Sequence, residues 1–329
     1  MREIPLIDIR SAAAAIYDLV VRTPLVRLPH WPSDPAGVDI YLKLETLQPT
    51  GSFKLRGAHN AVRQLTPAQR RDGVWTVSAG NAALGVALAA RHAGIACSVM
   101  VVDTAPAAKT DAIRRLGAAI VPASYDECWE TVTARRSPRM RGHFIHPFDD
   151  DRFIAGNGTL GLEILEDLPD VDAIVVAVGG GGLLCGVAAA VHALRPEVQI
   201  IAAEPETAAP LHVSLARGRP SQFEGWCASF VDGAGGRSVL PTMWPLLSRF
   251  VSESVVVPLA GVAVAMRVVA ERCHVISEGA GALPVAAALG GTARGKVVAI
   301  VSGGNIDLSR FAALVAASPT RTPQPALPT

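Results

Sequence analysis

Short apolar runs alternate with longer amphipathic segments along almost the whole chain. The runs predict buried strands at Ile40–Leu44, Val74–Val77, Cys97–Val102, Ala119–Pro122, Ala173–Val178, Gln199–Ala203, Ser254–Val257 and Val297–Val301. The amphipathic segments predict helices at Phe53–Gln64, Ala82–His92, Ala107–Leu116, Asp126–Ala134, Asp151–Glu166, Leu183–Leu194, Leu259–Cys273, Ala280–Leu289 and Ile306–Ala316. Short strands alternating with helices of this length are typical of parallel sheets. The pattern therefore predicts an α/β fold, in which ligands bind beyond the carboxyl ends of the strands.

The order of these elements suggests two domains. Residues 74–148 hold three of the predicted strands and three helices, which is enough to close a core of their own. We expect this segment to be a small domain inserted into a large domain made of residues 1–73 and 149–316. Residues 317–329 combine several prolines with little apolar content, which predicts a disordered tail.

The composition excludes some classes of function. Hydrophobic residues make up 50% of the chain and charged residues 18%, and the formal net charge is +1. Nucleic-acid binding needs a basic excess or patch, so we expect no nucleic-acid partner. The longest uncharged stretch, 173–194, could span a membrane, but four consecutive glycines interrupt it. A strand, a glycine turn and a helix fit it better, and no signal peptide precedes it, so we expect a cytoplasmic protein without a membrane span.

A lysine stands at the start of one predicted helix, in the stretch Thr50-Gly51-Ser52-Phe53-Lys54. The positive end of the helix dipole disfavours a charged lysine there. A surface lysine would avoid this cost by reaching into solvent. In a cleft, the dipole would instead lower the pKa of Lys54, as Schiff-base chemistry requires. The residue order of a P-loop is absent.

Two further junctions carry groups that bind anions. Ser78-Ala79-Gly80-Asn81 follows a strand and opens a helix, where free N–H groups and the Ser78 hydroxyl suit a carboxylate, although an ordinary capped turn is the alternative. Gly179–Gly182 also joins a strand to a helix, as phosphate-binding loops do. A dinucleotide site is the rival interpretation, because Glu204 follows about 20 residues later, but the G-x-G-x-x-G register fails.

The last predicted strand leads into Ser302-Gly303-Gly304-Asn305, which places the serine hydroxyl at the same edge, or in an ordinary turn. A reactive lysine, a carboxylate cradle, a phosphate loop and a serine together favour pyridoxal 5′-phosphate (PLP). That cofactor needs a Schiff-base lysine, a phosphate site and a partner for its ring nitrogen.

These motifs resemble those of the threonine/serine dehydratase and serine racemase family of fold-type II PLP enzymes. The matching stretches are Lys43-Leu44-Glu45, Thr50 to Ala58, Ser78 to Asn81, Gly179 to Leu183, Ala203-Glu204-Pro205 and Ser302 to Asn305, in family order, and the similarity runs from about residue 15 to 316. The resemblance implies an α/β fold like that of the tryptophan synthase β-subunit, with two parallel or mixed sheets covered by helices. It also implies an amino-acid substrate and a homodimer.

The resemblance assigns a role to each matching residue. Lys54 would carry PLP and remove the substrate α-proton. The cofactor would contact Phe53, Lys54, Asn81, Gly179, Gly180, Gly181, Gly182, Leu183 and Ser302, and the substrate would contact Ser78, Ala79, Gly80, Asn81 and Ala82. Ser302 is a neutral partner for the ring nitrogen, which favours β-elimination over transamination. Ala79 stands where related racemases carry a proton-transferring serine, which argues against racemisation.

The chain departs from the family pattern in two places. Ala82 and Leu84 replace a usual histidine and glutamine, which makes the expected pocket more apolar. The family's divalent-metal site uses a glutamate like Glu204 and an acid six residues later, but that second position is Pro210 here. A hard cation needs about six oxygen ligands, so Glu204 is a doubtful metal ligand and the need for a divalent or monovalent cation stays open.

The expected activity is that of a PLP-dependent ammonia-lyase, which converts a β-hydroxy-α-amino acid to a 2-oxo acid and ammonia. Threonine and serine are the default substrates. The apolar residues Ala82 and Leu84 raise the hypothesis of a larger substrate, 3-phenylserine, and so of a phenylserine dehydratase. The alternatives are a PLP-dependent β-replacement enzyme of the sulfhydrylase kind and, from another class, a nicotinamide-dependent oxidoreductase.

Overall fold

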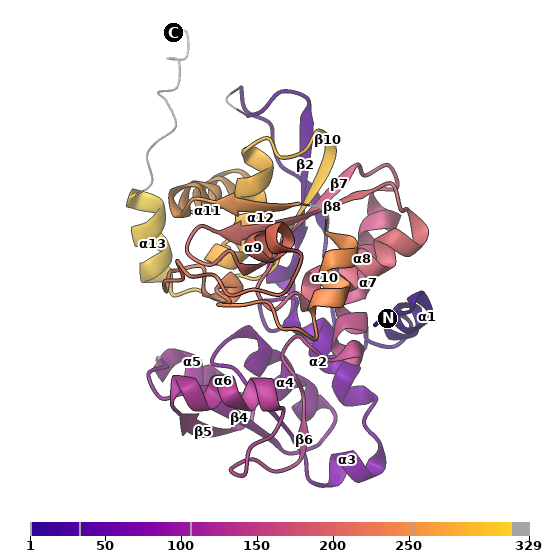
Figure 1. Ribbon diagram of the computed structural model, residues 1–329, viewed down its shortest axis with the longest axis vertical. Coiled ribbons are helices and arrows are strands. Elements are labelled where there is room, and N and C mark those ends of the chain that lie inside the picture. The colour runs from indigo at the N-terminus through magenta and orange to yellow at the C-terminus, as the bar shows by residue number, and fades with distance from the viewer. Residues whose placement is uncertain (1, 33, 106, 252, 318–329) are drawn as a thin grey trace.

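The computed structural model describes residues 2–32, 34–105, 107–251 and 253–317 and contains two sheets, each covered by helices (Figure 1). The larger sheet has six strands in the order β1-β2-β10-β7-β8-β9, and the smaller has four in the order β5-β4-β3-β6. The six strands are β1 (Leu25–Arg27), β2 (Val38–Leu44), β7 (Ala173–Ala177), β8 (Gln199–Pro205), β9 (Ser254–Val257) and β10 (Gly295–Val301). Strand β1 pairs antiparallel with β2, and the other pairs are parallel.

Both faces of the larger sheet are buried, as parallel strands require. In the central strand β7, Ile174 and Val176 join the core on one face, while Ala173 and Val175 join the core on the other. The first face is covered by α1 (Leu6–Ala13), α7 (Asp151–Asp167), α8 (Gly182–Leu194), α9 (Pro210–Arg217) and α10 (Trp244–Phe250). The second is covered by α11 (Leu259–Cys273), α12 (Gly279–Leu289) and α13 (Leu308–Ala317).

The smaller sheet follows the same rule. Its strands are β3 (Val74–Val77), β4 (Cys97–Val102), β5 (Ala119–Ala123) and β6 (His143–Phe144). Val99 and Val101 of β4 pack toward α4 (Asn81–His92) and α5 (Ala107–Arg115), while Met100 packs toward α6 (Tyr125–Ala134). Helix α2 (Lys54–Arg63) packs against both α4 and α7, so it joins the two sheets, and α3 (Pro67–Arg71) follows it (Figure 1).

The predicted α/β fold with two sheets is confirmed. Every predicted strand and helix is present, with ends shifted by no more than two residues. Strands β1 and β6 and helices α1, α3, α9 and α10 were not predicted, so the smaller sheet has four strands rather than three. Strands of two or three half-buried residues have no apolar run to reveal them. The division into a large and a small domain stays a prediction.

Two expectations concern single segments. The uncharged stretch 173–194 folds as β7, a glycine turn and α8, as predicted, and in the described ranges no helix is long and apolar enough to cross a membrane. The predicted disordered tail, 317–329, falls almost wholly outside the described residues, although Ala317 itself ends α13.

Candidate active site

Lys54 is the first residue of α2 and lies at the junction of the two sheets. Its Nζ donates a hydrogen bond to the carbonyl oxygen of Pro147 at 2.6 Å. The same nitrogen lies 5.1 Å from the ring centre of Phe53 and 5.6 Å from that of Phe153. Burial lowers the pKa of Lys54 to about 8, and the negative charge of Glu278 opposes part of this shift. The lowered pKa agrees in direction with the expectation from the sequence, and desolvation is its largest cause.

Asn81 is the first residue of α4, and its side chain is held at both ends. Its amide nitrogen donates to Glu278 Oε1 at 2.7 Å, and its amide oxygen accepts from Asn305 Nδ2 at 2.7 Å. Asn305 Nδ2 also donates to the carbonyl oxygen of Thr50 at 2.7 Å, which ties Asn81 to the segment that leads into α2. The side-chain amide of Asn81 is therefore fixed by both Glu278 and Asn305, which are distant from it in the sequence.

Glu278 is a site residue that the sequence analysis missed. It is buried directly before α12, and burial together with the charge of Asp232 raises the pKa of its carboxyl to about 7. The hydrogen bond from Asn81 and the charges of Lys109 and Lys54 act in the opposite direction. The available sequence signal was a lone acid in front of a glycine- and alanine-rich apolar helix.

The four glycines form a tight turn between β7 and α8. Gly181 has φ +88°, which side chains rarely adopt, and a Cβ on Gly180 would lie 2.2 Å from the ring of Phe148. The N–H groups of Gly179, Gly180, Gly181, Gly182 and Leu183 donate to no other residue in the described part of the chain. Unpaired N–H groups at a helix start are the donors that a phosphate needs.

Ser302 directly follows β10, as predicted, and its side chain is buried. Its hydroxyl lies 3.4 Å from the carbonyl oxygen of Ala280, and its own carbonyl oxygen accepts from the Phe53 N–H at 3.0 Å. The latter bond fixes the start of α2 against the end of β10. The end of β10 and the start of α2, which carries Lys54, are therefore held next to each other.

The predicted substrate-binding stretch lies between β3 and α4. Ser78 Oγ accepts from the Gly80 N–H at 3.1 Å, which closes a tight turn in front of the helix. Ala82 is buried in the first turn of α4, whereas Ala79 and Leu84 pack against the core between α4 and the smaller sheet. The apolar residue at Leu84 is thus explained by core packing.

The segment 146–148 joins the lysine to the glycine turn, and the sequence analysis also missed it. Pro147 accepts the hydrogen bond from Lys54, while the next residue, Phe148, packs against Gly180. The side chain of His146 is buried, which lowers the pKa of its imidazole to about 4 and keeps it neutral. A backbone carbonyl leaves no signature in a sequence, so its role emerges only from the fold.

Glu204 has a structural role in this chain. Its two carboxylate oxygens accept from the N–H groups of Leu211 and His212, both at 2.8 Å, and from Ser254 Oγ at 2.5 Å. It therefore caps the start of α9. Among the residues that the structure describes, Glu204 belongs to no cluster of three or more histidine, cysteine and acidic ligands, and we do not propose it as a metal ligand.

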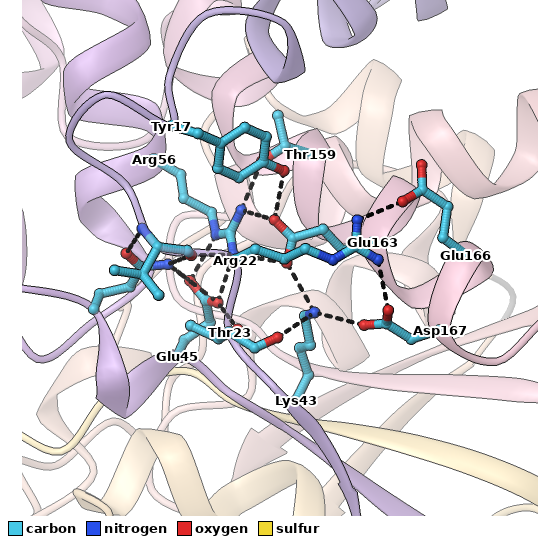
Figure 2. Close-up of polar contacts among 12 residues, drawn as sticks. Tyr17, Arg22, Thr23, Lys43, Glu45, Arg56, Thr159, Glu163, Glu166 and Asp167 are labelled. Carbon is cyan, nitrogen blue, oxygen red and sulfur yellow. Dashed lines mark hydrogen bonds and ion pairs between the residues drawn. The ribbon is translucent and has the colours of Figure 1, made fainter.

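A buried ion network includes Arg56 of α2 (Figure 2). Arg56 contacts Glu45 at 2.8 and 2.9 Å and Glu163 at 2.5 and 3.0 Å. Lys43 Nζ lies 2.8 Å from Glu163, and all four side chains are buried. Burial would raise the pKa of Glu163, but Arg56 and Lys43 hold it below its usual value. Two cations and two anions thus balance each other and anchor α2.

A lysine of lowered pKa, a glycine turn with unpaired N–H groups and a fixed asparagine are groups that fit PLP. The chain belongs to the family of pyridoxal-phosphate-dependent enzymes, whose model matches residues 16–303.

Several relatives are similar over nearly the whole chain. The L-threonine ammonia-lyase of Thermotoga maritima is 42% identical over 310 residues, 93% of this chain and 77% of the relative. A catabolic L-threonine dehydratase of Staphylococcus aureus is 35% identical, over 94% of this chain and 91% of the relative. Among solved structures, maize serine racemase has a TM-score of 0.85 and 32% identity, over 95% of this chain and 97% of that chain. Threonine deaminase isoform 2 of Solanum lycopersicum has a TM-score of 0.85 and 33% identity, over 94% and 91%.

These similarities confirm the predicted family, its fold type and its cofactor. The chain is a PLP-dependent lyase of a family that acts on amino acids. The nicotinamide-dependent oxidoreductase, the alternative from another class, is wrong.

Proposed function

We propose that this enzyme is a dehydratase that converts threonine or serine to a 2-oxo acid and ammonia. The observation that carries the proposal is the buried amine of Lys54 in a helix that packs against α4. Lys54 is linked to the glycine turn through Pro147 and Phe148, and its neighbour Phe53 is bonded to Ser302. The names of the threonine ammonia-lyase and threonine dehydratase relatives support this choice of substrate.

The cofactor would be held by residues that the fold leaves available for it. The N–H groups of Gly179 to Leu183 would bind its phosphate, Asn81 and Phe53 would flank its ring, and Ser302 would meet its ring nitrogen. When bound, PLP supplies a carbonyl group for the Schiff base and a ring that withdraws electrons from the substrate α-carbon.

Lys54 is suited to moving the α-proton. With a pKa of about 8, roughly a tenth of the Lys54 side chains are neutral at pH 7, against about 0.04% for an ordinary lysine. A neutral amine is both a nucleophile and a base. In this structure the hydrogen bond to Pro147 holds Nζ at the junction of the two sheets.

The start of α4 would bind the substrate carboxylate. The Ser78 hydroxyl and the first N–H groups of the helix lie together, where the helix dipole favours a negative charge. Binding there would hold the substrate α-carbon in a fixed orientation. Ala79 in this stretch has no proton to transfer, so we expect elimination rather than racemisation.

The width of the substrate pocket decides between threonine and 3-phenylserine. Of the two apolar residues that suggested a larger substrate, Leu84 is half-buried and packs against the core of the smaller sheet, so Ala82 is the stronger support. We therefore propose threonine and serine as the primary substrates, with 3-phenylserine as the specific competitor to test. A cytoplasmic homodimer stays our expectation for the assembly.

The test is a keto-acid release assay with the PLP-loaded enzyme on threonine, serine and 3-phenylserine. We expect the wild-type enzyme to release keto acid from threonine and serine. Lys54→Ala should lower this activity by at least about a thousandfold and should also lose the visible absorbance of the bound cofactor. Lys296→Ala, which changes a half-exposed surface lysine, should keep normal activity.

Two results would revise the proposal. Product that forms only when a thiol is supplied would assign the enzyme to β-replacement chemistry. A kcat/KM that favours threonine by tenfold or more would reject the 3-phenylserine hypothesis, and the reverse ratio would establish it.

A further inference from the structure

Three side chains from separate segments meet at the surface, beside the middle of α2 and the last residue of α4. Asp18 follows α1, His59 lies on α2, and His92 is the last residue of α4. The Nε2 atom of His59 lies 2.7 Å from Asp18 Oδ1, and that of His92 lies 2.9 Å from Asp18 Oδ2. In the part of the chain that the structure describes, this is the one group of three such side chains with all ligand atoms within 4.8 Å of one another.

The three segments share a small apolar platform beneath the cluster. Ile16 and Val20, on either side of Asp18, are buried against Leu55 of α2, and Leu88 of α4 packs on the same group. The backbones that carry the three side chains are therefore fixed relative to one another, although they come from different parts of the chain.

The exposure of the three side chains suits an ion that is open to solvent on one side. His59 is 4% exposed, so its ring is held firmly, whereas His92 and Asp18 are 39% and 53% exposed and have room to adjust. His59 Nδ1 is buried and has no hydrogen-bond partner among the described residues, whereas Nε2 faces Asp18, so Nε2 is the ring nitrogen that lies in the cluster.

Two imidazole nitrogens and one carboxylate oxygen are ligands that Zn²⁺ prefers, with bonds of about 2.0–2.2 Å. Ligand atoms of a tetrahedral ion with such bonds lie about 3.4 Å apart. The Asp18–His59 and Asp18–His92 separations of 2.7 and 2.9 Å are shorter than this value, so the exposed side chains of Asp18 and His92 would move apart modestly to admit the ion. Arg63 opposes the added positive charge, while the carboxylate of Asp18 favours it.

We propose that Asp18, His59 and His92 bind one Zn²⁺ ion, with water completing its coordination. Helix α2 begins at Lys54 and α4 begins at Asn81, so the ion would fasten together two helices whose first residues belong to the candidate active site. The ion would hold three parts of the chain together: α2, α4 and the segment that follows α1. This site does not depend on the identity of the amino-acid substrate.

The test is a calorimetric titration of ZnCl₂ into the tag-free, PLP-loaded enzyme after removal of metals by chelation. We expect one Zn²⁺ per chain and a rise in Tm on binding. Asp18→Asn and His92→Gln should each weaken Zn²⁺ binding at least tenfold and abolish the rise in Tm. Asn and Gln still form hydrogen bonds, so these variants separate metal binding from a hydrogen-bonded cluster.

His30→Gln is the matched control. His30 is an exposed histidine whose Nδ1 lies 4.0 Å from Asp34, without the third ligand, so Zn²⁺ binding should be unchanged. The proposal fails if the wild-type enzyme takes up no Zn²⁺ at 100-fold excess, or if Asp18→Asn and His92→Gln both bind the ion as tightly as the wild type.

Discussion

At the scale of single residues, the pairing of a buried lysine with a buried acid dominates the electrostatics of the site. Lys54 and Glu278 are each shifted toward neutrality by burial, the pKa of the lysine downward and that of the acid upward. Such opposed shifts are common where groups exchange protons, because both groups then titrate near the working pH. Glu278 also orients Asn81, so its charge and its hydrogen bond serve the same site.

Glu278 makes a testable contribution to the pH dependence of stability. Its pKa is about 7 in the native state against 4.5 in the reference state, so the native protein binds more protons between these values, and its stability falls as pH rises through that window. The full cost, up to about 3 kcal/mol, is present above pH 7. Glu278→Gln removes it and keeps an acceptor for Asn81.

The measurement is urea unfolding of the cofactor-free protein at pH 5 and pH 8. We expect the variant to gain about 2–3 kcal/mol over the wild type on going from pH 5 to pH 8. If the free energy of unfolding differs between variant and wild type by the same amount at both pH values, Glu278 does not have a raised pKa in the native protein.

The sequence placed Lys54 and Ser302 at junctions between strands and helices, and the structure has them there, because each directly follows or precedes a periodic segment. Their roles in the chemistry stay a prediction. Glu278 was missed because a lone acid before a helix has many ordinary roles. The carbonyl of Pro147 could not be predicted at all, since its identity as an acceptor depends on the path of the chain.

At the scale of elements, the turn between β7 and α8 combines two constraints. It must present unpaired N–H groups, and it must lie close to the segment that contacts Lys54. Gly180 meets the second constraint because Phe148 occupies the space that a Cβ would need. The glycines in the long uncharged stretch thus separate β7 from α8 and allow the turn between them to pack against Phe148.

Gly180→Ala tests the packing of this turn. The added Cβ would lie 2.2 Å from the Phe148 ring, and overpacking of this kind costs about 1–3 kcal/mol. We expect the affinity for PLP to fall between about tenfold and a hundredfold, because each 1.4 kcal/mol is a factor of about ten. Cofactor titration monitored by absorbance measures it.

Gly261→Ala in α11 is the control for Gly180→Ala. The nearest atom to its added Cβ is 3.7 Å away, so alanine fits, and helix propensity should stabilise the protein by up to about 1 kcal/mol. PLP affinity should be unchanged in this variant. If both alanine variants bind PLP equally well, the shape of the turn does not limit cofactor binding.

At the scale of the whole molecule, the two sheets are joined by α2, and the ion network holds α2 in place. Arg56 on α2 comes before the segment 74–148 in the sequence, and Glu163 on α7 comes after it. Their ion pair therefore joins the two parts of the chain that flank this segment (Figure 2). The alternation of strands and helices predicted the two sheets, but not this contact. Charged residues on amphipathic segments look alike in a sequence, whether they face solvent or one another.

The network therefore predicts very different effects for two glutamates on the same helix. Glu163→Gln removes the charge that Arg56 and Lys43 share in the interior, and breaking a buried pair costs about 3–5 kcal/mol. Because Lys43 keeps a contact with Asp167 at 3.1 Å and Arg56 keeps Glu45, we expect a loss near the lower end of that range. Glu166→Gln, whose partner Arg22 is half exposed, should cost less than about 1 kcal/mol. Urea unfolding of the PLP-loaded variants measures both, and equal losses would mean that the network does not hold α2 against α7.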